Sequence, residues 1–333
     1  MNENQLALSS SPHIHGKKTT RSIMGDVCIA LLPALAGAVY FFGLRALVVT
    51  LLSCAACVFF EWGYRKLMKL DSTVDDLSAV VTGMLIAFVC PVTIPYWALI
   101  VGDFFAIIVV KQLYGGVGKK FVNPALAARA FLMLAWPALM TVWVPSMSHV
   151  SILSGNSAVP DAVTAATPLA AMHTGALPEA SLLELFLGRT GGCLGETSAL
   201  LLLAGGIYLV VRKVISPRIP LVFLGTVALV AFLFPQGGAS GLQWVACSLL
   251  SGGVMLGAIF MATDYATSPV TPWGQVCFAV GCGLITMFIR YFGAYPEGVS
   301  YAILVMNVCT MLFDRIGRPR RFGLRKKKGG VKA

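Results

Sequence analysis

The chain has 333 residues, of which 57% are hydrophobic and only 12% are charged. A soluble globular protein carries charge on about 25% of its residues, so this composition excludes an ordinary soluble domain and predicts a polytopic membrane protein. The formal net charge is +11. The basic residues gather in the C-terminal tail and in short loops, where orientation in the lipid bilayer explains them, and no nucleic acid partner is expected.

Ten apolar segments follow one another along the chain, and each is a predicted transmembrane helix. Several are shorter than the roughly 20 residues of a straight crossing, which predicts tilted or broken helices. The predicted fold class is therefore an all-α polytopic membrane protein with about ten transmembrane helices. The segments lie at residues 24–43, 44–60, 77–91, 95–113, 121–143, 197–214, 219–234, 241–261, 274–291 and 298–313.

The distribution of Lys and Arg predicts the orientation of these helices. All but four of the 25 basic residues precede the first segment or follow an even-numbered one, which places them on one side of the membrane. Because basic loops stay in the cytoplasm, both termini are predicted to be cytoplasmic. The exceptions are Arg45, Arg189 and Arg290 on the opposite side and Arg129 within a segment, where its side chain can snorkel.

Five parts follow from this topology. Residues 1–23 are a cytoplasmic tail, 24–143 a first five-helix half, 144–196 an exterior loop, 197–313 a second five-helix half, and 314–333 a basic cytoplasmic tail. The stretch MLIAFVCPVTIP at 84–95 is similar to MLGAIFMATDYATSPVTP at 255–272. With five helices in each half the two copies face opposite sides, which predicts an inverted repeat with functional sites where the halves meet.

Polar residues inside apolar segments are candidates for function. Asp103 lies near the middle of the fourth segment, where an unpaired carboxylate costs several kcal/mol. It can belong to a cation path, or it can be protonated or bonded to a neighbouring helix. Asp26, Glu61 and Asp264 lie near segment ends and are expected to be interfacial. Cys54 and Cys57 have CxxC spacing, but they lie within a predicted helix without a partner cluster, so we interpret them as packed thiols and expect no metal site.

The exterior loop contains a polar island in an otherwise apolar chain. Asp161, Thr164, Thr167 and Thr174 lie within twenty residues of each other. No histidine has the spacing of a catalytic triad, and no phosphate-binding helix signature is present. The residue types alone are those of an ordinary loop with hydroxyl-capped turns, and no catalytic residue is predicted.

One short motif in this island resembles a known modification signal. The stretch DAVTAAT, residues 161–167, is similar to the flavinylation motif D-x-x-(S/T)-G-A-(T/S). Asp161, Thr164, Ala166 and Thr167 match it, while Ala165 stands where glycine is usual. In that motif an exported flavin transferase joins FMN through a phosphoester bond to the last hydroxyl residue, which is Thr167 here.

Further stretches resemble one family in the same order along nearly the whole chain. They are SPHIHGKKTTRSIM at 11–24, GGVGKKFVNPALAARAF at 115–131, FMATDYATSPVTPWG at 260–274 and PEGVSYAILVMN at 296–307. The family contains RnfD, a membrane component of the Rnf electron-transport complex, and NqrB, its relative in the Na+-translocating NADH:quinone oxidoreductase. The length and the short N-terminal tail favour the Rnf type. Tyr265 departs from the family, which often has proline after the aspartate.

The resemblance implies a membrane flavoprotein subunit of an ion-translocating ferredoxin:NAD oxidoreductase complex, which moves electrons and couples them to Na+ or H+ transport. It implies covalent FMN on the exterior side of the cytoplasmic (inner) membrane, partnership with the other complex subunits, and maturation by a flavin transferase. It also implies a second, non-covalent flavin such as riboflavin. Asn123, with Lys119 or Lys120 nearby, is a candidate for that second site, and a helix break packed between the two halves is the alternative.

A function of another class stays open on the sequence. Two inverted five-helix halves suit a stand-alone channel for a small solute of the urea or ammonium type, and the resemblance permits such a shared fold. Fold alone does not separate a channel from an electron-transfer protein.

Overall fold

The computed structural model describes residues 19–147, 152, 167–196, 198–238 and 240–315. These parts of the chain are helical and contain no strand, which confirms the predicted all-α class. The motif residues Asp161 and Thr164 lie outside the described residues.

The first half is built on two long helices. α1 (Thr20–Phe42) begins after Thr19, whose hydroxyl accepts from the Ser22 amide, and α2 (Leu44–Leu67) follows after a single glycine. A short 3₁₀ turn, η1 (Val74–Asp76), leads to α3 (Ser78–Val89), α4 (Tyr96–Phe104), the π-helix η2 (Phe105–Gln112), α5 (Pro124–Ala135) and α6 (Pro137–Met140). Helix α3 packs against α2 at Gly83, where an added Cβ would lie 2.7 Å from the Cys54 Cα.

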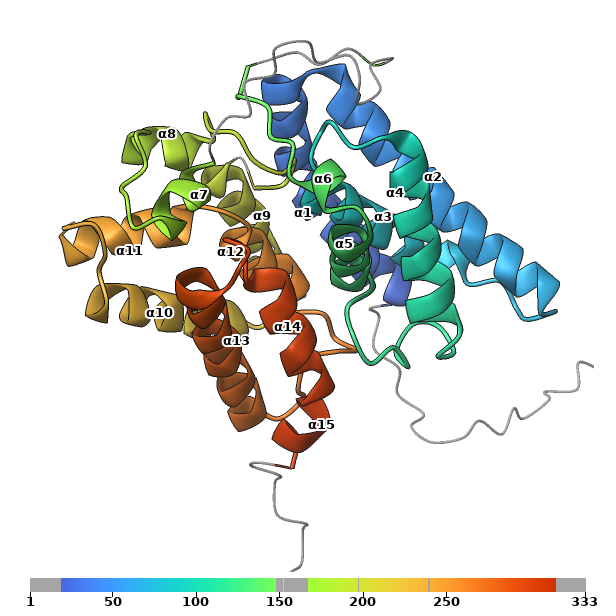
Figure 1. The fold of residues 1–333 in the computed structure, drawn as a ribbon. Coiled ribbons are helices and arrows are strands. Elements are labelled where there is room, and N and C mark those ends of the chain that lie inside the picture. The colour runs from blue at the N-terminus through green and yellow to red at the C-terminus, as the bar shows by residue number, and fades with distance from the viewer. Residues whose placement is uncertain (1–18, 148–151, 153–166, 197, 239, 316–333) are drawn as a thin grey trace, which may run out of the picture.

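The connection between the halves contains two short helices, α7 (Pro168–His173) and α8 (Leu182–Leu187). Helix α8 begins with a capping box, in which Ser181 and Glu184 satisfy each other's backbone amides. The second half then consists of α9 (Ala199–Val211), α10 (Arg218–Leu233), α11 (Gly241–Leu250), α12 (Val254–Leu256), the π-helix η3 (Gly257–Met261), α13 (Pro272–Phe292), α14 (Val299–Val308) and α15 (Thr310–Phe313). Figure 1 shows the two halves side by side, with α7 and α8 close to α11.

The predicted segment 241–261 is a broken helix. The α11 axis and the axis of residues 254–261 differ by 68°. Gly252 has a φ of +71°, a conformation that glycine adopts without strain, so Ser251, Gly252 and Gly253 interrupt the helix. Broken membrane helices expose backbone groups that other polar groups must satisfy. Polar partners are therefore expected around this break.

A helix occurs in each of the ten predicted segments, but among the residues that the structure describes only three helices are long and apolar enough to cross a membrane by themselves. They are α1, α2 and α13, and the broken pair of α11 with residues 254–261 is a fourth candidate. The structure is thus that of a polytopic membrane protein with several short apolar helices, and the count of ten transmembrane helices stays a prediction.

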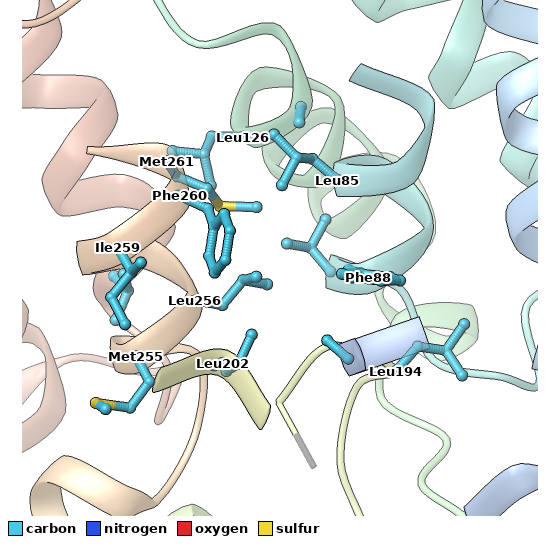
Figure 2. Packing of buried hydrophobic residues seen from close by; sticks show 14 of the residues in the cluster. Leu85, Phe88, Leu126, Leu194, Leu202, Met255, Leu256, Ile259, Phe260 and Met261 are labelled. Atoms are coloured by element: carbon cyan, nitrogen blue, oxygen red, sulfur yellow. The ribbon is translucent and has the colours of Figure 1, made fainter. Parts of the chain in front are cut away.

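The two similar stretches of the predicted repeat meet in the core. Figure 2 shows Leu85 and Phe88 of α3 opposite Leu256 and Phe260 of α12 and η3. Gly195 lies between them and allows this close packing, because an added Cβ there would lie 2.6 Å from Phe88 and 3.0 Å from Leu256. The centre of the molecule is therefore the junction between residues of both halves.

Candidate functional site

Thr167 begins helix α7. Its backbone is extended, its hydroxyl oxygen accepts a hydrogen bond of 3.1 Å from the Ala170 amide, and Pro168 occupies the first helical position. This is the usual chemistry of a helix N-cap. The sequence prediction of an ordinary hydroxyl-capped turn is therefore confirmed at Thr167, and the capping geometry holds its side chain in one orientation.

A small cavity lies beside Thr167. Its volume is about 80 Å³, far below the roughly 300–1,000 Å³ of pockets that enclose a whole organic ligand. The lining comes from both halves and includes Trp143, Glu196, Ser251 and Glu297. The cavity is therefore large enough for a small polar group and too small to enclose an aromatic ring system.

A buried ion cluster lies next to this cavity. The Arg129 guanidinium, only 4% exposed, contacts the Glu297 carboxylate directly and lies 3.6 Å from Glu196. It also donates to the Val89 carbonyl at the end of α3 and to the Cys193 sulfur at 3.4 Å. The prediction that Arg129 snorkels to the interface is wrong, because its carboxylate partners lie inside the protein.

Sequence reasoning missed Cys193, Glu196 and Glu297 as partners of Arg129. The signal was available, since an arginine inside an apolar segment requires anionic partners. The identity of the partners could not be predicted, because Glu196 and Glu297 lie 67 and 168 residues further along the chain.

Asp103 of α4 is completely buried against α2. Its Oδ1 accepts from Ser53 Oγ at 2.7 Å and from Cys57 Sγ at 3.5 Å, whereas Oδ2 has no hydrogen-bond partner. The structure thus shows the bonded arrangement that the sequence left open. It also places the Cys57 thiol in a packed contact between helices, as predicted.

Glu61, which the sequence predicted to be interfacial, is completely buried inside the protein. Its carboxylate accepts from Lys111 Nζ at 2.7 Å and from Gln112 Nε2 at 2.9 Å, and Thr73 donates a further bond. Lys111 and Gln112 lie on η2, where the wider π-helical turn places both side chains toward α2. Lys111 is thus also a buried residue and not a loop cation.

Asn123 and Lys120 lie together at the entrance to α5. The Asn123 side chain caps α5 by accepting from the Ala125 amide, and it donates to the Met261 carbonyl of η3. Lys120 pairs with Asp264 at 2.6 Å. The adjoining cavity has a volume of about 60 Å³, so in this conformation the residues serve helix packing between the halves and do not fit a flavin ring.

The comparisons with known proteins agree on one family. The model of the NQR2, RnfD, RnfE family matches residues 7–323. This chain belongs to that family. It is 51% identical over 338 residues to the D subunit of the Na(+)-translocating ferredoxin:NAD(+) oxidoreductase complex of Acetobacterium woodii, with both chains covered completely.

Two further relatives of the NQR2, RnfD, RnfE family cover almost the whole chain. The D subunit of the proton-translocating ferredoxin:NAD(+) oxidoreductase complex of Clostridium ljungdahlii is 40% identical, over 97% of this chain and 98% of its own. The D subunit of the ion-translocating oxidoreductase complex of Stutzerimonas stutzeri is 39% identical, over 90% and 91%. Family membership confirms the resemblance that the sequence motifs indicated.

Proposed function

We propose that this chain is the flavin-carrying membrane subunit of an ion-translocating ferredoxin:NAD+ oxidoreductase complex. The observation that carries the proposal is the full-length similarity to the D subunits of such complexes. The other subunits of the complex are then its partners, and the cytoplasmic membrane is its location, with both termini inside and Thr167 on the exterior side.

The geometry at Thr167 supports attachment of FMN by a phosphoester bond. The Thr167 oxygen accepts a hydrogen bond from Ala170, and an ester oxygen retains lone pairs for that bond. The adjoining cavity, with a volume of about 80 Å³, offers space for a phosphoryl group. When bound, the flavin supplies the one-electron chemistry, while Thr167 attaches it and the α7 cap orients it. An exported flavin transferase is the partner that this modification requires.

Intact mass of the purified chain tests this function directly. We expect one added mass equal to FMN minus water when the chain is coexpressed with a flavin transferase, and the unmodified mass without the transferase. An unmodified chain in both preparations would contradict the proposal.

We propose the region of Asn123 and Lys120 as a second, non-covalent flavin site only in a more open conformation. The support is the juxtaposition of an amide, a cation and the carboxylate of Asp264 around one cavity. No electron-transfer step is assigned to this site, because its present volume does not admit the ring.

Asp103 is proposed as a residue of the ion pathway. Its unpartnered Oδ2 is a buried acceptor inside the protein, and such atoms require a proton, cation or water. We expect Asp103→Asn to lower Na+- or H+-dependent transport of the assembled complex in proteoliposomes by tenfold or more, at unchanged protein content.

The matched control is Asp71→Asn. It makes the same substitution at an exposed aspartate, in the connection after α2. Full transport by the Asp103→Asn complex, equal to that of the control, would exclude Asp103 from the pathway.

A further inference from the structure

The ion cluster next to Thr167 contains residues from both halves of the chain. Arg129 comes from α5, Cys193 and Glu196 from the connection before α9, and Glu297 from the residues before α14. The Cys193 sulfur and one carboxyl oxygen from each glutamate lie within 4.8 Å of one another. Two carboxyl groups at this separation repel each other when both are ionised.

Two polar atoms that face the cavity beside Thr167 lack hydrogen-bond partners. They are Glu196 Oε1 and Ser251 Oγ, and the side chains of these residues are about nine-tenths buried or more. Both residues line the cavity together with Thr167 and Glu297. Buried polar atoms are nearly always hydrogen-bonded, and a cavity of this size holds water. A proton on the Glu196 carboxyl group, together with water in the cavity, would supply the missing hydrogen bonds.

With the proposed phosphodiester on Thr167, the formal charge of the region would require a further positive charge. Arg129 and Glu297 form one ion pair, and Arg290, which donates to the Ser248 and Ser251 carbonyls, offsets Glu196. A phosphodiester on Thr167 would add one negative charge to a balanced set. Uncompensated charge is costly in a buried site.

We propose that Glu196 and Glu297 share one proton and form a proton-binding site that compensates the charge of the phosphoryl group on Thr167. The compensation rests on the proposed function, whereas the shared proton does not. A divalent metal ion fits these ligands less well, because the Arg129 guanidinium already contacts the Cys193 sulfur and both carboxyl groups. Proton uptake converts one carboxylate to a carboxylic acid that donates to the other.

The titration of the pair agrees with this geometry. Burial first, and then repulsion by Glu297, raise the pKa of Glu196 to about 8, against the opposing effect of Arg129. The pair therefore holds its proton at neutral pH and loses it as the pH rises through that value. The titratable and charged groups that interact with the pair are Arg129, Cys193, Arg290 and Tyr301.

Infrared difference spectroscopy of the purified complex during a pH titration tests the shared proton. We expect the carbonyl stretch of a protonated carboxylic acid to disappear with a midpoint near pH 8 when Thr167 carries no phosphoryl group, and at a higher pH in the flavin-carrying complex. Glu196→Gln should abolish this signal, and Glu196→Asp should retain a shifted one. The control Glu179→Gln removes an exposed carboxylate of the same connection and should leave the signal unchanged. Absence of the signal, or its persistence in Glu196→Gln, would overturn the proposal.

A Thr167→Val complex separates the shared proton from the proposed function. We expect this variant to keep the carboxylic acid signal with a midpoint near pH 8, about one pH unit below that of the flavin-carrying complex, because the phosphoryl charge is missing. An identical midpoint in the two complexes, with flavin verified on the unsubstituted chain by mass, would overturn charge compensation. A chain that never carries flavin would contradict the proposed function, while the Glu196→Gln result would still decide the shared proton.

Discussion

Replacement of Thr167 by valine is expected to abolish covalent flavin completely. Valine has nearly the shape of threonine but no hydroxyl, so it cannot form the phosphoester. The substitution also removes the acceptor for the Ala170 amide, which costs about 1 kcal/mol for a helix cap and leaves a stable membrane protein folded. Flavin fluorescence of the chain in a denaturing gel, after coexpression with a flavin transferase, measures the result.

The matched control for this experiment is Thr164→Val, which changes the other threonine of the motif. We expect the Thr164→Val chain to keep its fluorescence, with some loss of yield because the transferase reads the motif. Fluorescence that persists in Thr167→Val and disappears in Thr164→Val would move the attachment site to Thr164. A fluorescent chain in both single variants would place the flavin elsewhere.

Replacement of Lys111 by methionine is expected to lower the free energy of unfolding by about 3–5 kcal/mol. The Lys111 and Glu61 side chains are only 2% and 0% exposed. Lys111 also donates to Ser78 Oγ at 2.7 Å. Removal of the cation leaves the Glu61 carboxylate buried without its counter-ion, although Gln112 and Thr73 still donate to it. Denaturant unfolding of the purified chain in detergent, followed by tryptophan fluorescence, measures the change.

Two further variants make the Lys111 experiment specific. The double variant Lys111→Met with Glu61→Gln removes both charges and should recover a large part of the lost stability, because no uncompensated charge remains. Arg212→Gln breaks an ion pair with Asp26 in which the arginine side chain is 54% exposed, and it should destabilise the chain less than Lys111→Met, because water screens the arginine and Tyr208 still donates to Asp26. A Lys111→Met chain as stable as the Arg212→Gln chain would show that the buried pair contributes little.

The family assignment weighs against the stand-alone channel that the sequence left open. Relatives that match at least 90% of the chain are named as subunits of oxidoreductase complexes, and the two described cavities next to candidate residues have volumes of about 60 and 80 Å³. The electron-transfer interpretation therefore accounts for more of the chain, including the long loop 144–196, which a solute channel does not need.

Helix positions were largely predictable because hydropathy is a local property. The predicted segment 274–291 corresponds to α13 at Pro272–Phe292, and 219–234 corresponds to α10 at Arg218–Leu233. Segment 241–261 was predicted as one helix, although its SGG sequence at 251–253 is where the axis bends. The sequence contained those glycines, but whether they pack helices or break one depends on backbone angles that only the folded chain defines.

By itself, the sequence determined the membrane class, the all-helical architecture, the family and the candidate attachment residue Thr167. These depend on composition, on apolar runs and on short contiguous motifs. Only the tertiary structure decided which charges are paired. Arg129 meets Glu297, and Lys111 meets Glu61, through helices that are distant in sequence and adjacent in space. A buried charge obliges the chain to supply a partner, but which residue supplies it is set by how the helices pack.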